Sequence, residues 1–221
     1  MIPNSSELLG VVWPLILAYL LGSIPTAVWI GRWFYHIDIR KYGSKNAGAT
    51  NVMRVLGIKA GVPVLLIDMF KGWAAVSLMV FQNYYNQDSE QGVVYAICLG
   101  VLAVMGHIFP VFAGFKGGKG VATVTGVCAG LVPLATITAF MLFLIVVILT
   151  KYVSLGSLSA AVYFSVYILL IVPHSIISMR VFSVIVTLLI IITHRKNIHR
   201  LWKGEENKAT FLYKSQNLKS D

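Results

Sequence analysis

Long stretches without a charged residue constrain this chain more than any other feature. Residues 8–30, 92–112 and 121–150 each contain no Asp, Glu, Lys or Arg, and about 20 apolar residues allow a helix to cross a membrane. Only 12% of the 221 residues are charged, whereas a soluble domain carries about 25%. A soluble globular domain and a disordered chain are therefore excluded. The sequence predicts an all-α polytopic transmembrane helix bundle, a single integral-membrane domain over residues 1–221.

The basic residues predict how this bundle is oriented. The polar segment 31–59 contains six Lys or Arg residues and one acid, and the tail that begins at residue 194 is also basic at first. Lys and Arg accumulate in cytoplasmic loops. We therefore expect this segment and the C-terminus in the cytoplasm and the N-terminus outside.

The number of crossings depends on the stretch 121–150. This stretch is too long for one untilted span and short for two spans. A break near Pro133 gives seven crossings, with Pro173, His174 and Arg180 in an external turn. The alternative has five crossings, with one tilted helix over 121–150 and residues 181–192 merged into the preceding hairpin. The other expected crossings are residues 8–30, 60–81, 92–112 and 155–172. Both models place residues 32–59, 113–120 and 194–221 in the cytoplasm.

The charge and the missing motifs narrow the function further. The net charge of +10 fits cytoplasmic loops that face anionic lipid headgroups, so nucleic acid is not expected as a partner. The histidine spacings fit no zinc pattern and no Cys-x-x-Cys pair occurs. The Gly-x-Ser-x-Gly elbow is missing, and so is the His-x4-Asp pairing usual in acyltransferases. We expect no metal and no cofactor.

The first cytoplasmic segment contains a dense polar cluster between residues 43 and 54. Its hydroxyls, amides and guanidinium can all donate to phosphate oxygens. The cluster comprises Ser44, Asn46, Thr50, Asn51 and Arg54. The alternative is a helix-capping loop, in which Ser, Thr and Asn are also preferred. A cap needs only one or two such residues, so the cluster favours a binding site.

The second segment, residues 106–120, ends an apolar run with His107 and Pro110 and continues as Lys-Gly-Gly-Lys-Gly. Glycines allow successive backbone N–H groups to converge on an anion, and lysines supply countercharge. An expected helix N-terminus directly after the turn would add to this. The turn is not a Walker A loop, because Lys119 precedes Gly120. The alternative is a cytoplasmic loop with turn glycines.

Two further features carry charge. Residues 194–208 are basic and contain Trp202, which is typical of a segment that binds anionic lipid. Asp68 and Lys71 lie three residues apart within an expected span, where charged residues indicate function. An organic-phosphate transporter would use such residues, although it usually shows an internal repeat, and none is visible. A non-catalytic lipid-binding scaffold would explain the basic loops but not the polar cluster.

Three motifs give the chain a resemblance to a known family. They are Gly-Ser-x-Asn-x-Gly-Ala-Thr-Asn-x-x-Arg at 43–54, Gly-His-x-Phe-Pro-x-Phe-x-x-Phe-Lys-Gly-Gly-Lys-Gly-Val-Ala-Thr at 106–123, and His-Arg-x-Asn-Ile-x-Arg-Leu-x-x-Gly-x-Glu at 194–206. Together they resemble the bacterial PlsY family, acyl-phosphate-dependent glycerol-3-phosphate acyltransferases. Lys45 and Ala47 stand where family members often have Gly and Pro.

The resemblance implies a reaction and a location. A fatty acyl group would pass from acyl phosphate to the 1-hydroxyl of sn-glycerol 3-phosphate, giving lysophosphatidic acid and inorganic phosphate, the first step of phospholipid synthesis. The protein would lie in the bacterial cytoplasmic (inner) membrane with its active site facing the cytoplasm. Its partners would be glycerol 3-phosphate, acyl phosphate and membrane lipids, with an acyl-phosphate-producing enzyme upstream.

The resemblance also implies which residues form the site. Catalytic roles fall on Ser44, Arg54, His107 and Glu206. Substrate binding falls on Ser44, Asn46, Thr50, Asn51, Arg54, Lys71, Lys116, Gly117, Gly118, Lys119, Thr123, His194 and Asn197. The turn at 116–119 is expected to hold the phosphate of glycerol 3-phosphate. The general base stays open among His107, Glu206 and a substrate phosphate.

Overall fold

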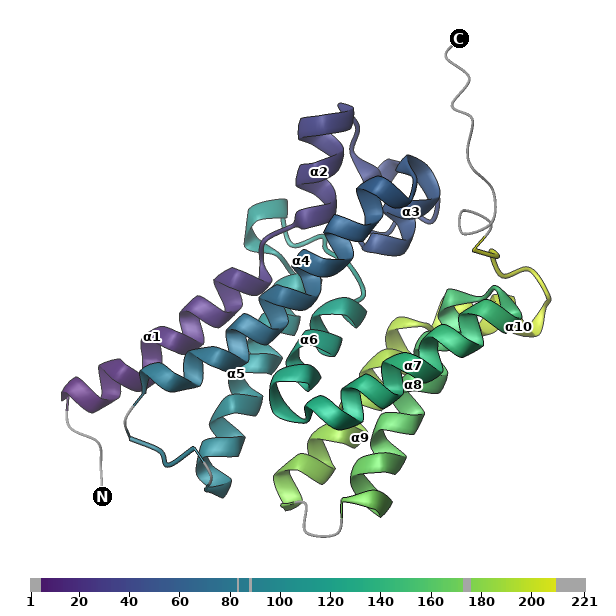
Figure 1. Cartoon of the computed structure of the whole chain (residues 1–221). Coiled ribbons are helices and arrows are strands. Elements are labelled where there is room, and N and C mark those ends of the chain that lie inside the picture. Colours follow the sequence, from purple (N-terminus) through teal and green to yellow (C-terminus); the bar gives the residue numbers. More distant parts are fainter. Residues whose placement is uncertain (1–4, 83, 88, 173–175, 210–221) are drawn as a thin grey trace.

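The protein is described by a computed structural model that covers residues 5–82, 84–87, 89–172 and 176–209, and these residues form helices and loops without strands. The α-helices run in the order α1 Ser5–Gly22, α2 Thr26–Tyr35, α3 Ala49–Leu56, α4 Ile58–Ser77, α5 Glu90–Ile108, α6 Val121–Leu131, α7 Pro133–Thr150, α8 Val153–Val166, α9 Ile177–Thr193 and α10 Arg195–Trp202 (Figure 1). Short helical turns are η1 Ile39–Lys41, η2 Leu78–Phe81, η3 Val111–Ala113 and η4 Tyr167–Ile171. The predicted all-α class is confirmed.

Several helices are long and apolar enough to cross a membrane. Among the described residues there are four, Ile58–Phe81, Glu90–Ala113, Pro133–Thr150 and Val153–Ile171, or up to six if α1 with α2 and α9 with α10 each count as one bent span. The bends are 44° and 62°. Helix α6 has 11 residues, about 16 Å, against a hydrocarbon core of about 30 Å. The chain is a multi-pass membrane protein, and the seven crossings and the orientation stay predictions.

Two expected details of the spans have clear outcomes. The break near Pro133 is confirmed, because α6 ends at Leu131 and α7 begins at Pro133, where proline suits the first helical position. The single tilted helix of the alternative is therefore wrong. Arg180 was expected in an external turn but lies inside α9. Pro173, His174 and residues 210–221 of the tail lie outside the described residues.

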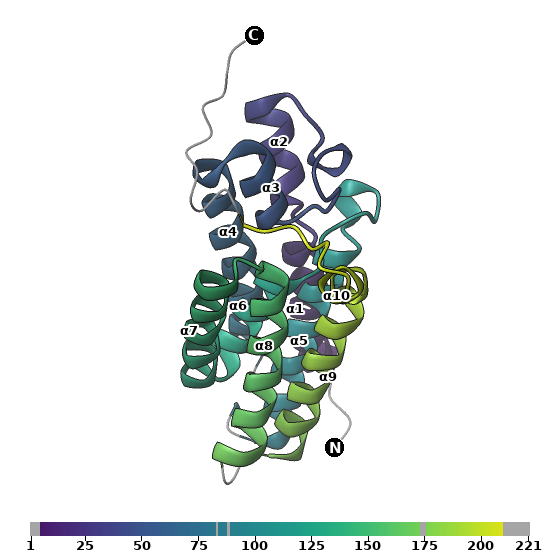
Figure 2. The ribbon, with the colours of Figure 1, turned by 90° about the vertical axis from the view of Figure 1, so that its right-hand side faces the viewer.

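The helices form two groups that lie side by side. Helices α1, α4, α5 and α6 pack together, and α7, α8 and α9 form the second group (Figures 1 and 2). Glycines allow the closest approach, because a Cβ at Gly72 would lie 2.1 Å from the Thr123 carbonyl oxygen, and one at Gly126 would lie 1.8 Å from that of Met69. Small residues bring membrane helices together in this way. The short α2, α3 and α10 lie at one end of both groups.

The charged pair within α4 stabilises the bend between α1 and α2. Lys71 Nζ lies 2.8 Å from Asp68 Oδ1 and donates to the Ile24 carbonyl oxygen at 2.8 Å, while Thr26 Oγ1 donates to Asp68 Oδ1 at 3.1 Å. Both charged side chains are buried. The break before Pro25 exposes backbone that needs partners within the membrane. Lys71 supplies one, and this structural role explains its position.

Candidate functional site

The site is a cavity of about 660 Å³ between the two helix groups. Its polar wall comes from the loops and short helices at the end where α3 and α10 lie. The predicted residues that line it are Ser44, Asn46, Thr50, Asn51, Arg54, His107, Gly118, Lys119, His194, Asn197 and Glu206. Three segments far apart in the sequence therefore meet at one cavity. Lys71, Lys116, Gly117 and Thr123 are not in its lining.

The deeper part of the cavity is apolar. Helices α6 to α9 line it with residues that include Cys128, Phe140, Phe164 and Val186. Ser154, at the polar end, and Phe164 lie ten residues apart on α8, which is about 15 Å along the helix axis. The cavity thus combines a cationic, hydrogen-bonding end with an apolar channel between membrane helices.

The loop before α3 is held by the side chain of Asn51, which is buried. Its Nδ2 donates to the carbonyl oxygens of Ile39, Tyr42 and Asn46 at 3.0–3.2 Å, and its Oδ1 accepts the N–H of Ser44 at 2.8 Å. The prediction that the Asn51 amide donates to substrate is therefore corrected. Its donors are used within the fold, where the side chain positions Asn46 through its amide group and Ser44 through its amide oxygen.

We expect Asn51→Ala to lower the free energy of unfolding by about 2–4 kcal/mol, because it leaves buried backbone carbonyls without a donor. Asn51→Asp should destabilise the protein similarly, since a carboxylate accepts but cannot donate. Thermal unfolding in detergent measures both changes. Asn46→Ala is the matched control, and a control that is equally destabilised would contradict this role.

The backbone N–H groups of Gly117 and Gly118 are bonded within the protein and are not free to bind a ligand. The Gly117 N–H donates to the Ile108 carbonyl oxygen at 3.1 Å, and the Gly118 N–H donates to that of His107 at 3.2 Å. The expectation that the amides of these two glycines hold a phosphate is therefore corrected. Glycine is needed for close packing, because a Cβ at Gly117 would lie 1.9 Å from the His107 carbonyl oxygen and one at Gly118 would lie 2.3 Å from His107 Nε2.

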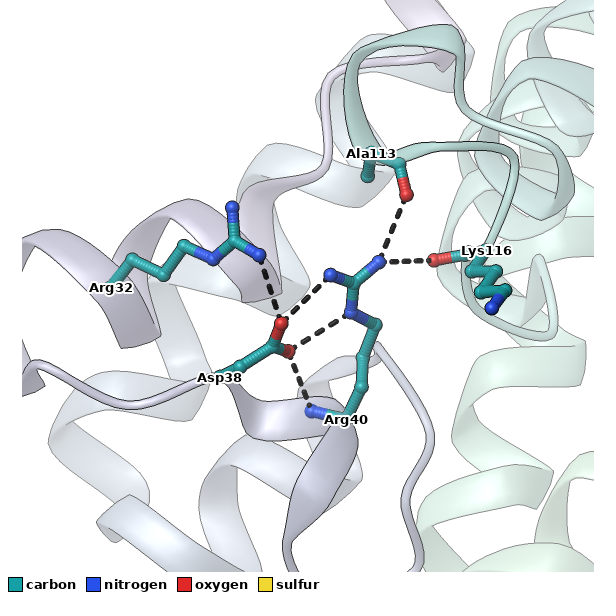
Figure 3. Close-up of polar contacts among 5 residues, drawn as sticks. All are labelled: Arg32, Asp38, Arg40, Ala113 and Lys116. Carbon is teal, nitrogen blue, oxygen red and sulfur yellow. Dashed lines mark hydrogen bonds and ion pairs between the residues drawn. The ribbon is translucent and has the colours of Figure 1, made fainter.

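The two lysines of the turn point to different places. Lys119 lines the cavity, and its Nζ donates to Asn197 Oδ1 of α10. Lys116 borders a separate hollow beside Asp38 and Arg40, and its carbonyl oxygen faces Arg40 (Figure 3). Only Lys119 is therefore placed to bind a ligand in the cavity, and the joint role predicted for both lysines is corrected.

Glu206 is the centre of a hydrogen-bond network at the polar end. Its Oε1 accepts from Asn197 Nδ2 at 2.6 Å and from Ser154 Oγ at 3.0 Å, and its Oε2 accepts from Arg200 Nε at 2.7 Å. Burial raises the pKa of Glu206, but the hydrogen bonds from Arg200, Asn197 and Ser154 outweigh it and hold the pKa below its usual value. The carboxylate is thus ionised and fixed.

Sequence reasoning missed two members of this network. Arg200 lies in the third motif, so its charge there was a signal that could have been followed. Ser154 is a serine near the start of an apolar helix, and nothing in its sequence surroundings distinguishes it from a packing residue.

The side chains of His107 and Thr123 differ in their access to the cavity. His107 lines it, and its Nδ1 lies 3.7 Å from Asp68 Oδ1, which is beyond hydrogen-bond distance. Thr123 is fully buried at the contact between α4 and α6. His107 therefore stays a candidate for chemistry, whereas Thr123 has a packing position.

Positive charge dominates the polar end. Arg54, Lys119 and Arg200 line the cavity there together with Glu206, and the other acid of the lining, Asp68, is paired with Lys71. Burial, together with the nearby cations Arg200 and Arg54, lowers the pKa of Lys119 to about 8 against the attraction of Glu206. Cations that repel one another in a partly buried site favour an anionic ligand.

Comparison with known proteins shows which family the chain resembles. The family model described as glycerol-3-phosphate acyltransferase matches residues 12–204. The chain is 46% identical to glycerol-3-phosphate acyltransferase 2 of Bacillus anthracis, over 88% of this chain and 96% of that one. It is 41% identical to glycerol-3-phosphate acyltransferase of Staphylococcus carnosus, over 91% of this chain and 99% of that one.

Solved structures give the same result. The chain superposes, with a TM-score of 0.80 and 35% identity over 92% of this chain and 99% of the other, on the glycerol 3-phosphate form of PlsY, an integral membrane glycerol 3-phosphate acyltransferase. The lysophosphatidic acid form of PlsY gives a TM-score of 0.77 and 34% identity. The family predicted from the three motifs is confirmed: the chain belongs to the glycerol-3-phosphate acyltransferase family.

Proposed function

We propose that this protein transfers a fatty acyl group from acyl phosphate to the 1-hydroxyl of sn-glycerol 3-phosphate, releasing lysophosphatidic acid and inorganic phosphate. The observation that carries this proposal is the shape of the cavity. Its cationic end with Arg54, Lys119 and Arg200 suits phosphate groups, and its apolar channel suits a fatty acyl chain. Both substrates carry phosphate, and one also carries the chain.

The reaction needs no covalent enzyme intermediate. Acyl phosphate is an activated mixed anhydride, so the hydroxyl oxygen attacks the acyl carbon directly. A carbon–oxygen ester bond forms, the bond from the acyl carbon to the phosphate oxygen breaks, and the hydroxyl proton is removed. The protein contributes by holding the two reactants together and by stabilising charge on the departing phosphate.

Two walls of the cavity have distinct parts in this proposal. Lys119 and Asn197 bind the phosphate of glycerol 3-phosphate, and Ser44, Thr50 and Arg54 bind the phosphoryl oxygens of the donor. His194 completes the pocket from the end of α9. Residues of both walls line the same cavity, which suits an attack by one substrate on the other.

Of the three candidates for removing the hydroxyl proton, His107 and a substrate phosphate fit the geometry better than Glu206. Both oxygens of Glu206 already accept hydrogen bonds from protein donors, which makes it a weak base and a support for Asn197. His107 and a substrate phosphate are left. Near-normal turnover by His107→Gln would favour the substrate phosphate.

The proposed location follows from the same arrangement. The polar end of the cavity is formed by the basic segments that the positive-inside rule places in the cytoplasm. We propose a bacterial cytoplasmic membrane protein whose site faces the cytoplasm. The enzyme that makes acyl phosphate would deliver its product at that face.

The test is an assay of the purified protein in detergent with acyl phosphate and glycerol 3-phosphate. We expect equal release of phosphate and lysophosphatidic acid, with Arg54→Gln as the matched inactive variant. Absence of both products would overturn the proposal. Uptake of glycerol 3-phosphate into proteoliposomes without acyl transfer would instead indicate a transporter.

The pH profile of kcat/KM for glycerol 3-phosphate should fall above about pH 8. Lys119 binds phosphate as a cation, its pKa of about 8 means that it is charged below this value, and the charge is lost as pH rises. The profile of kcat/KM reports groups of the free enzyme. In Lys119→Arg the fall should move to higher pH, because arginine stays charged. An unchanged profile in that variant would contradict the assignment.

A further inference from the structure

Arg40 lies outside the cavity lining, yet it joins two segments that form the cavity. It belongs to η1, in the first polar segment. Its Nη1 donates to the Ala113 carbonyl oxygen at 2.9 Å and to the Lys116 carbonyl oxygen at 3.3 Å (Figure 3). These contacts reach more than 70 residues along the chain, into the turn that leads to Lys119.

The guanidinium of Arg40 is fixed from its other side. Asp38 accepts from Arg40 Nε at 2.9 Å and from Nη2 at 2.7 Å, a bidentate pair, and it also accepts the backbone N–H of Arg40 at 3.1 Å. Arg32 Nη2 adds a further contact to Asp38 at 2.9 Å. The Asp38 and Arg40 side chains are only 16% and 21% exposed. A planar donor held in this way has a defined direction.

The turn that Arg40 contacts has an uncommon backbone. Gly114 and Phe115 both have positive φ, 64° and 58°, and φ > 0 is rare for a bulky residue such as phenylalanine. The N–H groups of Ala113 and Phe115 both donate to the Pro110 carbonyl oxygen. Arg40 binds the carbonyls at 113 and 116, on either side of these two residues. Arg40 therefore stabilises a turn conformation that is unfavourable for the local sequence.

The first segment is equally fixed behind Arg40. Asn51 of α3 donates to the carbonyl oxygen of Ile39, next to Arg40, and α3 also carries Arg54. Beyond the turn, the Gly117 N–H is held by α5, and Lys119 follows two residues later. Hydrogen bonds joined by short stretches of backbone thus connect the wall that contains Arg54 with the wall that contains Lys119.

We infer that Arg40 is a positioning residue. It fixes the Lys119 wall of the cavity (residues 113–120) in position relative to the Arg54 wall (residues 43–54). The structural part of this role does not depend on the proposed function. The expected effect of Arg40 on the rate of acyl transfer does rest on it. Both walls must hold their substrates at reacting distance, and small misplacements slow such a reaction strongly. Arg40 itself does not line the cavity.

The test compares Arg40→Ala with Arg32→Ala, a matched variant that removes a cation from the same carboxylate but does not reach residues 113–116. We expect Arg40→Ala to lower kcat by about tenfold or more, with a smaller change in KM because Lys119 keeps its charge. Arg32→Ala should stay close to the unchanged protein. Arg40→Lys should behave like Arg40→Ala, because an ammonium group cannot replace the bidentate fork.

Hydrogen exchange supplies a readout that does not depend on activity. Amides of residues 113–119 should exchange faster in Arg40→Lys, while those of α9 stay unchanged. Unaltered exchange, or the same loss of kcat in Arg32→Ala, would overturn the inference. If the unchanged protein transfers no acyl group, the proposed function fails, and the exchange experiment still decides the role of Arg40. Arg40→Lys also serves if the alanine variant does not fold.

Discussion

Lys119→Met is expected to lower kcat/KM for glycerol 3-phosphate by about a hundredfold or more, the usual effect of removing a partly buried charge that pairs with a substrate anion. Lys119 is the lysine of the turn that lines the cavity, and its Nζ reaches Asn197. Methionine keeps most of the side-chain volume and removes the charge. Steady-state kinetics with both substrates varied measures the change.

Lys116→Met is the matched control for this prediction. Lys116 lies three residues earlier, carries the same charge and borders a different hollow. We expect its kcat/KM to stay within about threefold of the unchanged protein, as for a surface charge. Equal losses in the two variants would mean that the general charge of the turn, and not one ammonium group, binds the substrate.

Gly117→Ala is expected to raise KM for glycerol 3-phosphate strongly and to destabilise the protein by about 1–3 kcal/mol, the usual cost of forcing extra volume into a packed site. The new Cβ would lie 1.9 Å from the His107 carbonyl oxygen, 2.7 Å from Pro110 Cδ and 2.8 Å from the Ile108 carbonyl oxygen. The turn must shift away from α5 and carry Lys119 with it. KM for acyl phosphate should change less, because the Arg54 wall is a separate segment.

Gly10→Ala provides the control for adding a methyl group to a glycine. Gly10 lies in α1, and a Cβ there meets no atom within 4 Å. Alanine is also the better helix former, so activity and stability should not fall. A larger rise in KM for acyl phosphate than for glycerol 3-phosphate in Gly117→Ala would assign this wall to the other substrate.

Much of the fold could be predicted from the sequence because its signals are local. Uncharged runs identified membrane helices, and Pro133 marked the break before α7. The number of crossings could not be deduced in the same way, because an apolar helix as short as α6 has the composition of a span without its length. The three polar segments were also evident, since hydroxyl, amide and basic residues are conspicuous between apolar runs.

The roles of individual polar residues could not be predicted as well. Asn51 and Lys71 have the chemistry of phosphate ligands, but their donors satisfy backbone carbonyls of the loop before α3 and of the bend before α2. A sequence shows which groups a side chain carries and not which partner it meets. Ser154 and Arg40 illustrate the converse, since their importance lies in contacts with residues far along the chain.

The sequence by itself determined the class of fold, the family and the three segments that meet at the site, because hydrophobicity, charge and motif spacing are properties of neighbouring residues. Only the tertiary structure decided that Lys119 and not Lys116 faces the cavity, and that Gly117 and Gly118 pack against His107 instead of cradling an anion. The physical reason is that side-chain direction and donor satisfaction depend on how α5, α3 and α10 come together, which no local pattern records.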